Sequence, residues 1–223
     1  MKIAIDGPAG AGKSTISKET AKRLGFIYID TGAMYRSVGL AALNAGVSTT
    51  DEEELGKIIS DIDISIKNVD NTQRFYLCGE DVTEKIREPE VSVAASNVAV
   101  VPAVRLKLVE LQRRMAENAD VLMDGRDIGT YVLPNAELKI FLTASVDERA
   151  RRRYEELCSK NVKTTLEAVK NDIIYRDKND SEREFAPLKP APDSVLLDTT
   201  DMTVEEVINK ILNLIKERRN VII

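Results

Sequence analysis

The stretch Met1–Thr15, MKIAIDGPAGAGKST, decides the fold. Its apolar residues 3–5 belong to a short predicted strand, and Gly7 to Ser14 then match the spacing G-x-x-x-x-G-K-[ST]. Glycines let the backbone turn its N–H groups inward, and the following helix directs the positive end of its dipole to the same place. This pattern predicts a loop that cradles phosphate groups between a strand and a helix.

The polar positions of this loop predict what it binds. Lys13 is expected to reach the β- and γ-phosphates of a nucleoside triphosphate as a point charge, and the Ser14 hydroxyl is expected to bind Mg²⁺. A glycine-rich turn without a ligand is the alternative, but the complete match between a predicted strand and a predicted helix disfavours it. The expected triphosphate-binding residues of the loop are Gly7, Pro8, Ala9, Gly10, Ala11, Gly12, Lys13, Ser14 and Thr15.

The composition excludes several classes of function. At 223 residues the chain is long enough for one well-buried core, and its formal charge of −5 disfavours binding to polymeric DNA or RNA. It contains no histidine, which excludes histidine acid–base catalysis and histidine metal ligands. Cys78 and Cys158 lie far apart and indicate free thiols in a reducing compartment. No apolar run is long enough for an export signal or a membrane span, so we expect a cytoplasmic protein that does not bind membranes.

Apolar runs followed by helical periodicity predict an α/β fold with one parallel sheet. Ligands of such sheets bind outside the carboxyl ends of the strands, which places Asp6, Asp30 and Asp124 on the expected active rim. The predicted strands are 2–6, 26–30, 121–124, 138–144 and 194–198.

Helices are predicted by apolar stripes and by capping residues. Residues 90–118 read as helix with an interruption near Pro102. The other predicted helix starts are Ser145-x-x-Glu148, Thr164-x-x-Glu167 and the capping box Thr203-Val204-Glu205-Glu206.

Two segments depart from the α/β alternation. Residues 62–78 change to period two and predict a small β insertion, in which Cys78 is expected to be a small apolar filler. Residues 147–183 are unusually rich in charge of both signs. Neither segment is bounded by a linker, so we expect one folded unit with two elaborations.

The phosphate loop alone leaves GTPases, ATPases and small-molecule kinases open. A GTPase needs Asp-x-x-Gly and Asn-Lys-x-Asp, but no glycine here has an aspartate three positions earlier, and Asn209-Lys210 is followed by Ile211-Leu212. A large mechanical ATPase is usually longer or carries a partner-binding domain. These absences favour a small kinase.

Three further motifs indicate which family of small kinases the sequence resembles. They are Asp30-Thr31-Gly32-Ala33-Met34-Tyr35-Arg36, Asp124-Gly125-Arg126-Asp127-Ile128-Gly129-Thr130 and Arg176-Asp177-x-x-Asp180-x-x-Arg183-x-x-Ala186-Pro187-Leu188. With the phosphate loop, they make the sequence resemble the bacterial cytidylate kinases of the nucleoside monophosphate kinase group, nearly from end to end. Thr31 stands where a serine is also common, a variation that keeps the hydroxyl.

The resemblance implies transfer of a phosphoryl group from ATP to CMP or dCMP with Mg²⁺. It implies a single domain over residues 1–223 with a P-loop three-layer α/β fold and a central five-stranded parallel sheet. A β-containing insertion at about 36–104 is then the monophosphate-binding arm, and about 147–183 is an arginine-rich helical lid. The acceptor phosphate has a second pKa of about 6, so no general base is required at neutral pH. Catalysis then reduces to aligning two polyanions and neutralising their charge, a task for arginines.

The same resemblance implies the roles of individual residues toward the acceptor. Arg36 and Arg126 hold its phosphate with their planar forks. The expected catalytic residues are Lys13, Arg126, Arg36 and Arg183. The expected CMP-binding residues are Thr31, Tyr35, Arg36, Ser96, Arg105, Asp124, Arg126, Asp127, Arg176, Asp180 and Arg183.

The expected site also includes residues that recognise the cytosine base and arginines of the lid that close on ATP. Ser96, Arg105 and Asp127 match family positions that read the cytosine edge, because a carboxylate accepts from the exocyclic amine and uracil reverses that match. Arg149 and Arg153 are the expected lid arginines toward ATP.

Two alternatives stay open at this point. Another small-molecule kinase, for UMP, AMP or shikimate, has the same loop, and a non-catalytic regulator would use ATP as a switch. The motif DGRDIGT at 124–130, together with Ser96 and Arg105, argues against another acceptor. The regulator gives no reason for so many arginines in the acceptor motifs. We expect the protein to be a monomer that binds ATP together with CMP or dCMP.

Overall fold

The strand that leads into the phosphate loop lies at the centre of a parallel sheet in the computed structural model, which describes residues 1–69 and 72–222. By its internal contacts the chain forms two units, one of Met1–Asp30 with Arg113–Ile223 and the other of Thr31–Gln112. The sheet and the phosphate loop both belong to the first unit.

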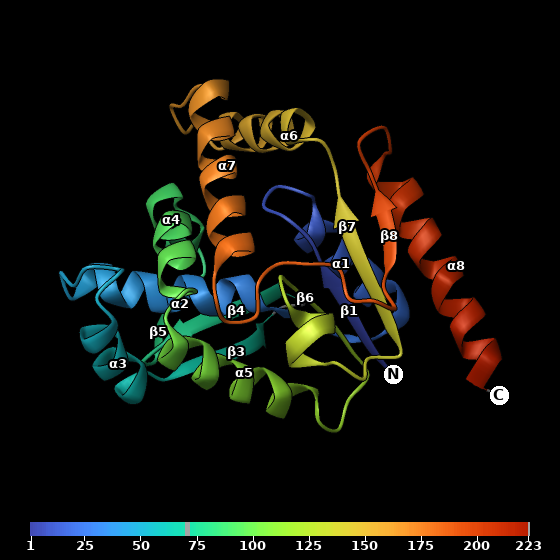
Figure 1. The fold of residues 1–223 in the computed structure, drawn as a ribbon, viewed down its shortest axis with the longest axis horizontal. Coiled ribbons are helices and arrows are strands. Elements are labelled where there is room, and N and C mark those ends of the chain that lie inside the picture. The colour runs from blue at the N-terminus through green and yellow to red at the C-terminus, as the bar shows by residue number, and fades with distance from the viewer. Residues whose placement is uncertain (70–71, 223) are drawn as a thin grey trace. The chain divides into compact units, whose positions relative to one another are not determined.

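The sheet of the first unit has the strand order β2-β6-β1-β7-β8, and all neighbouring strands are parallel (Figure 1). This confirms the predicted five-stranded parallel sheet, with each strand within one residue of its predicted bounds at either end. The direction of the connections reverses at β1, which puts the phosphate loop at the switch point where open α/β sheets bind ligands. The strands are β1 (Lys2–Asp6), β2 (Ile27–Asp30), β6 (Val121–Gly125), β7 (Leu138–Thr143) and β8 (Val195–Asp198).

Two of the three helix starts predicted for the first unit from capping residues are correct. The Ser145 hydroxyl accepts from the Glu148 N–H at 3.2 Å, and Thr203 with Glu206 forms the predicted capping box. One start was wrong by a residue: the cap before the charged helix is Thr165, which accepts from the Ala168 N–H at 3.1 Å, and not Thr164. The helical elements are α1 (Lys13–Leu24), the π-helical turn η2 (Ile128–Val132), α6 (Val146–Ser159), α7 (Leu166–Glu182) and α8 (Val204–Ile222).

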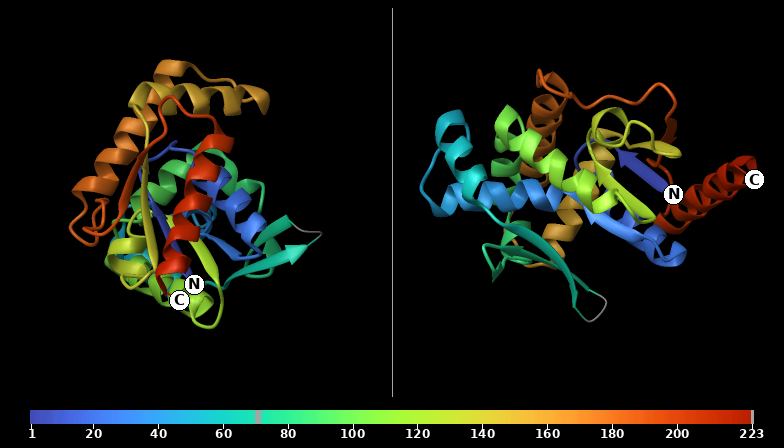
Figure 2. Two further views of the ribbon diagram at one scale, coloured as in Figure 1. Left: turned by 90° about the vertical axis from the view of Figure 1, so that its right-hand side faces the viewer. Right: turned by 90° about the horizontal axis from the view of Figure 1, so that it is seen from below.

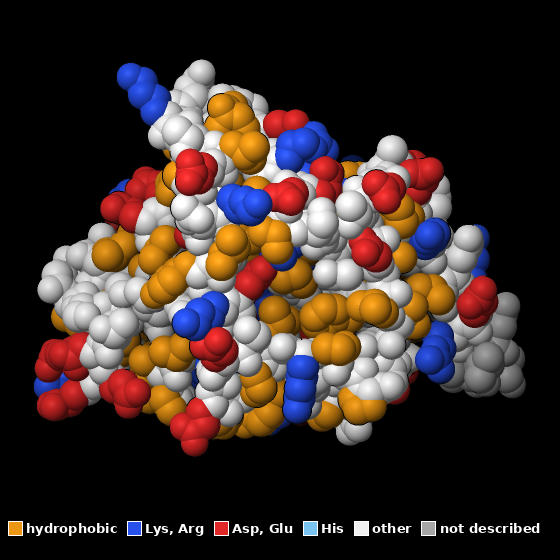
Figure 3. Space-filling model, turned by 45° about the horizontal axis from the view of Figure 1, so that its top comes forward, with side chains coloured by type: hydrophobic (Ala, Val, Ile, Leu, Met, Phe, Trp, Pro, Cys, Tyr) orange, Lys and Arg blue, Asp and Glu red, His pale blue; other side chains and the backbone are white. Residues whose placement is uncertain are grey.

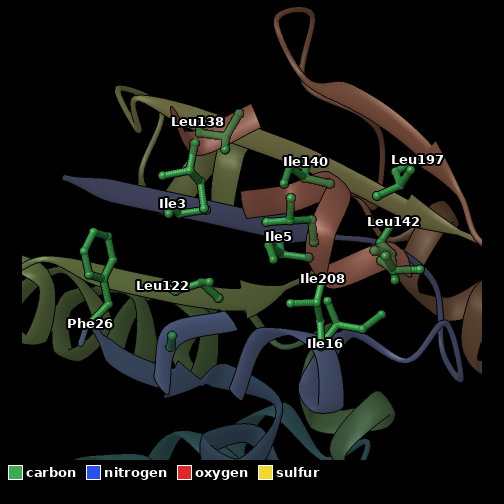
Figure 4. Packing of buried hydrophobic residues seen from close by; sticks show 14 of the residues in the cluster. Ile3, Ile5, Ile16, Phe26, Leu122, Leu138, Ile140, Leu142, Leu197 and Ile208 are labelled. Atoms are coloured by element: carbon green, nitrogen blue, oxygen red, sulfur yellow. The ribbon is translucent and has the colours of Figure 1, made fainter. Parts of the chain in front are cut away.

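A hydrophobic core lies between the sheet and the helices α1 and α8 (Figure 4). Ile5 of β1 and Leu142 of β7 are fully buried, and Ile16 of α1 and Ile208 of α8 close over them. Burying an aliphatic side chain of this size contributes about 1.5–3 kcal/mol, so this core holds the phosphate loop on a rigid strand and helix. A separate cluster, Ala150, Leu157, Val169 and Ile173, packs α6 against α7.

The described residues of the second unit form an antiparallel sheet and four α-helices. Its strands pair in the order β3-β4-β5, and Ile64 lies opposite Leu77 in the register (Figure 2). The strands β3 and β4 confirm the predicted insertion, whereas the short β5 was not predicted. Cys78 is exposed in the turn after β4 with φ 48°, so its prediction as an apolar filler was wrong. The elements are α2 (Thr31–Asn44), α3 (Glu52–Asp61), β3 (Ile64–Val69), β4 (Thr72–Leu77), β5 (Glu80–Asp81), the 3₁₀ turn η1 (Lys85–Arg87), α4 (Pro89–Val98) and α5 (Pro102–Ala116), which continues past the end of the unit.

The predicted helix at 90–118 is two helices. α4 ends at Val98, and α5 begins at Pro102, which fits the N-terminal preference of proline.

Within the described ranges, no single helix has the length and apolar character to cross a membrane, although α4 and α5 would pass that test together with a bend of 100° between them. On the face drawn in Figure 3, basic and acidic side chains are interspersed.

Candidate active site

The phosphate loop is held against the neighbouring strand at its first glycine. Gly7 has φ +151°, and a Cβ atom there would lie 1.9 Å from the backbone oxygen of Leu142 in β7. No side chain fits in that space, so the motif requires glycine for a close backbone approach as well as for its dihedral angle. The loop therefore leaves β1 at a position fixed by β7.

Lys13, which is expected to bind the phosphates held by this loop, is buried. Its Nζ donates to the backbone oxygen of Pro8 at 2.6 Å. Burial, together with the positive charge of Arg126, lowers the pKa of Lys13 well below its usual range, while Asp124 and Asp180 act in the opposite direction. A cation whose charge is disfavoured in this way gains when phosphate oxygens arrive, because they supply the missing negative charge.

Ser14 and Asp124 bring two oxygen ligands together beside the loop. The Ser14 hydroxyl donates to Asp124 Oδ2 at 3.0 Å, and the Tyr28 hydroxyl donates to Asp124 Oδ1 at 2.9 Å. Asp30 pairs with Asp124 in the strand register. Burial, and then the negative charge of Asp30, raises the pKa of Asp124 to about 6. A nearby cation would relieve this unfavourable negative charge.

The oxygen ligands in this place fit Mg²⁺, which prefers oxygens and keeps several waters. Among residues 1–69 and 72–222 there is no group of three or more histidine, cysteine, aspartate or glutamate side chains that could hold a metal. A Mg²⁺ ion here would therefore depend on the Ser14 hydroxyl, with Asp124 beside it, and on oxygens of the nucleotide and water.

Asp6 connects the phosphate loop to the loop that follows β6. It is the last residue of β1, and its Oδ1 and Oδ2 accept from the backbone N–H groups of Ile128 and Gly129, both at 2.7 Å. Burial raises the pKa of Asp6 to about 6, although these two hydrogen bonds act against the rise. A buried carboxylate therefore sets the backbone directly after Arg126 and Asp127.

Two arginines that the sequence predicts to bind the acceptor form one network with two carboxylates. Arg126 Nε donates to Asp180 Oδ2 at 2.6 Å, and Arg183 Nη2 donates to Asp127 Oδ1 at 3.2 Å. Arg183 Nη1 also lies 3.7 Å from Asp180 Oδ1. Burial would raise the pKa of Asp180, but Arg126 and Arg183 outweigh it and hold that pKa below its usual range. The structure thus brings four predicted residues from two motifs together.

Arg176 adds a further positive charge to this network. Its Nη1 lies 3.5 Å from Asp172, one turn earlier on α7. Burial, and then the neighbouring charge of Arg126, lowers the pKa of Arg176. Positive charges that gather in a partly buried place favour the binding of an anion.

The two predicted lid arginines have different environments. Arg149 is only 4% exposed. It donates to the backbone oxygens of Ala9 and Ala144 at 2.8 and 2.9 Å, and its Nη1 lies 2.6 Å from Asp177 Oδ2. Arg153 is partly exposed and donates to Glu156 at 2.7 Å. Arg149 thus contacts the backbone of the phosphate loop, and Arg153 is the more accessible of the two.

The remaining predicted residues lie in the second unit. Thr31 is buried at the start of α2, Tyr35 and Arg36 follow it on that helix, and Ser96 is buried on α4. Arg105 of α5 is fully buried, with Nη1 donating to the backbone oxygen of Ala99 at 3.1 Å and its guanidinium 5.7 Å from the ring centre of Tyr35. Arg105 and Tyr35 therefore lie close together within this unit.

Sequence reasoning missed two residues that shape the site. Asp6 was placed on the active rim, but its hydrogen bonds to the loop after β6 were not foreseen. Asp177 was part of a recognised motif, but no role was derived for it. Its carboxylate accepts from the Ala9 N–H at 3.0 Å. The only sequence signals were the position of Asp6 next to Gly7 and the position of Asp177 next to Arg176.

The sequence is similar to known proteins over nearly its whole length. The sequence matches the family model described as Cytidylate kinase over residues 3–217. It is 54% identical over 214 residues to the cytidylate kinase of Caldicellulosiruptor bescii, covering 96% of this chain and 95% of that protein. It is 49% identical over 220 residues to the cytidylate kinase of Ligilactobacillus salivarius, covering 99% and 98%.

Two solved structures are similar at much lower sequence identity. A gluconokinase from Sinorhizobium meliloti aligns with a TM-score of 0.50 and 14% identity over 99% of this chain and 94% of that chain. An uncharacterized protein from Eubacterium ventriosum aligns with a TM-score of 0.56 and 11% identity, covering 97% and 98%. These likenesses support the fold alone.

Proposed function

The chain belongs to the cytidylate kinase family, and from this premise we propose which of its residues carry out the reaction. The enzyme transfers the γ-phosphoryl group of ATP to CMP or dCMP, and the products are ADP and CDP or dCDP. The observation that supports our assignment most strongly is that buried Lys13, which donates to the backbone of the phosphate loop, feels the charges of Arg126 and Asp180, which form an ion pair with each other.

On the donor side, Lys13 and the loop N–H groups hold the triphosphate. Lys13 gains electrostatically when phosphate arrives, since burial and Arg126 disfavour its charge in their absence. The loop is rigid where it leaves β1, so ATP binds to a prearranged set of donors. We place Mg²⁺ at Ser14 with Asp124 beside it; when bound, the ion would neutralise charge on the phosphates.

On the acceptor side, Arg126 with Arg36, Arg176 and Arg183 binds the monophosphate. Roughly nine-tenths of the acceptor phosphate is already a dianion at neutral pH, so its oxygen needs no base to attack the γ-phosphorus. As that bond forms, the bond from the γ-phosphorus to the bridging oxygen of ADP breaks. The arginines align the two phosphates and offset their repulsion.

The cytosine edge is read by Asp127 with Arg105 and Ser96 in this proposal. The Asp127 carboxylate accepts from the exocyclic amine of cytosine, and Arg105 and Ser96 donate to its ring nitrogen and carbonyl. Uracil presents a carbonyl to the carboxylate and an N–H to the arginine, so buried polar groups would be left mismatched. Asp127 is buried and already accepts a hydrogen bond from Arg183 Nη2, which orients its carboxylate.

We also propose roles for the other predicted residues and segments, and a location and oligomeric state for the enzyme. Thr31 and Tyr35 line the monophosphate pocket, Asp180 contacts the sugar, and Arg153 is the accessible lid arginine toward ATP. The segment around 36–104 is the monophosphate-binding arm, and the enzyme acts as a cytoplasmic monomer.

Kinetics and calorimetry of Arg126→Met test this assignment, with Arg151→Met as the control. Arg151 is an exposed arginine of α6 that pairs only with Glu148 and Glu155 in the described chain. Hydrogen bonds to charged groups are worth about 1.5–3 kcal/mol, so kcat/KM for CMP should fall by roughly tenfold to a hundredfold in Arg126→Met. The dissociation constant for ATP should stay within about threefold. An equal loss of ATP affinity would contradict the acceptor-side role of Arg126.

A further inference from the structure

One peptide segment of the phosphate loop is held on both sides by a partly buried ion pair, in which Arg149 is buried and Asp177 is partly exposed. Asp177 Oδ1 accepts from the Ala9 N–H at 3.0 Å, and Arg149 Nη1 donates to the Ala9 oxygen at 2.8 Å. The same Nη1 lies 2.6 Å from Asp177 Oδ2. Both backbone polar groups of Ala9 are thus satisfied by two side chains that also bind each other.

The pair is itself fixed by the helices that carry it. Arg149 Nε donates to the backbone oxygen of Ala144, just before α6, and the side chain is buried. The cluster containing Ile173 packs α6 and α7 together. A Cβ atom on Gly10 would lie 3.2 Å from Arg149 Cβ and from Ile173 Cδ1, so the tip of the loop lies directly on both helices.

Helix α7 contacts the donor loop and the acceptor arginines within about one turn. Asp177 binds Ala9, and three residues later Asp180 accepts from Arg126 Nε at 2.6 Å. Residues three apart on a helix lie on the same face. A rigid helix that carries both carboxylates on one face therefore sets the spacing between the two phosphate-binding parts of the first unit.

We propose that Asp177, with Arg149 as its partner, is a positioning residue that holds the Ala9 segment so that the following N–H groups face the phosphates of ATP. This assignment rests on the proposed function, because it presumes that ATP binds this loop. It gives Arg149 a fixed structural place in the ATP site, and it leaves Arg153 as the lid arginine. Asp177 does not touch substrate; it acts through the backbone of the loop.

The chemistry of the pair predicts graded effects of substitution. Asp177→Ala removes the acceptor of the Ala9 N–H and the partner of Arg149. Asp177→Asn keeps an oxygen for the Ala9 N–H but removes the charge that faces Arg149. Glu182→Gln is the matched control, because Glu182 is an exposed carboxylate on the same helix, 3.9 Å from Lys178.

The experiment measures the dissociation constant for ATP by calorimetry, the KM of each substrate and the thermal midpoint for these variants. We expect Asp177→Ala to weaken ATP binding about tenfold and Asp177→Asn about threefold, with the KM for CMP within twofold and Glu182→Gln unchanged. Unaltered ATP affinity in both variants, or equal losses for ATP and CMP, would overturn the proposal. If Asp177→Ala does not fold, Asp177→Asn decides by the same criteria. The outcome is distinct from failure of the proposed function, which the wild-type enzyme would show by not phosphorylating CMP.

Discussion

Replacing Asp6 by asparagine distinguishes the effect of its buried charge on protein stability from the effect of its hydrogen bonds on activity. In the wild type, the two carboxylate oxygens accept from the N–H groups of Ile128 and Gly129, both at 2.7 Å. Asparagine in the same position offers one oxygen, and its amide nitrogen faces the other N–H. One buried backbone donor then lacks an acceptor, which costs about 1–3 kcal/mol.

The loss of charge at Asp6 works in the opposite direction. Burial raises the pKa of Asp6 from 3.8 to about 6, which corresponds to about 3 kcal/mol of disfavoured charge at pH 7. Asparagine does not carry this penalty. The two contributions oppose each other with similar size, so we expect the free energy of unfolding of Asp6→Asn to stay within about 2 kcal/mol of wild type at pH 7.

Activity should respond more strongly than stability. The N–H groups that Asp6 holds directly follow Arg126 and Asp127, so their displacement moves the groups that bind the acceptor. We expect kcat/KM for CMP to fall at least about tenfold, with the KM for ATP changed less than threefold. Asp201→Asn, an exposed carboxylate with the same change in charge, is the control. Wild-type kcat/KM in Asp6→Asn would refute the reasoning.

The pH dependence of stability provides a second check on Asp6. Because its folded pKa is raised, its favourable contribution is complete below about pH 4 and is lost as the pH rises through about 6. Asparagine does not titrate. The stability of wild type relative to Asp6→Asn should therefore decrease by up to about 3 kcal/mol between pH 4 and pH 7, measured by denaturant unfolding. If the difference in the free energy of unfolding between wild type and Asp6→Asn does not vary with pH, burial does not raise the pKa of Asp6.

Three further substitutions test other parts of the site. Lys13→Ala should lower kcat at least about a hundredfold without lowering the thermal midpoint, since burial disfavours the lysine charge; near-normal turnover would remove Lys13 from its assigned role. Gly7→Ala should lower the thermal midpoint by about 10 °C or prevent folding, because its Cβ would lie 1.9 Å from the Leu142 oxygen; a midpoint within 2 °C would contradict this geometry. Asp127→Asn should reduce the preference for CMP over UMP at least about tenfold, measured as the ratio of kcat/KM values, and an unchanged ratio would show that the base is read elsewhere.

The sequence predicted the parts of the fold that depend on local pattern. The apolar runs before Asp6 and Asp124 identified central strands, because parallel strands buried on both faces are continuously apolar. The phosphate loop was found from its spacing alone. Its position at the switch point then followed from the general rule for open α/β sheets.

The parts that the sequence did not predict depend on how distant segments meet. Asp6 binds residues more than a hundred positions away, and Asp177 binds Ala9 across a similar separation. Such partners depend on strand order and helix packing, which no local pattern specifies. Arg149 shows the same limit: its charge and spacing indicated a lid arginine, but burial between the loop and α7 decides what it contacts.

Small local errors have a different physical cause. Thr164 and Thr165 are both good cap residues, and the choice between them depends on where the chain enters α7. Cys78 lies in a turn with a left-handed backbone, an uncommon conformation for a residue other than glycine, so it is exposed instead of filling the core.

The most direct test of the central claim is the release of ADP by the purified enzyme with Mg-ATP and a panel of acceptors. CMP, dCMP, UMP, AMP and shikimate are each supplied in a separate reaction. The account predicts rapid turnover with CMP and dCMP and little with the other three. Preferred turnover of another acceptor would keep the kinase but contradict the assignment of Asp127, Arg105 and Ser96 to cytosine. Bound ATP with no turnover of any acceptor, in a folded protein, would contradict the account as a whole.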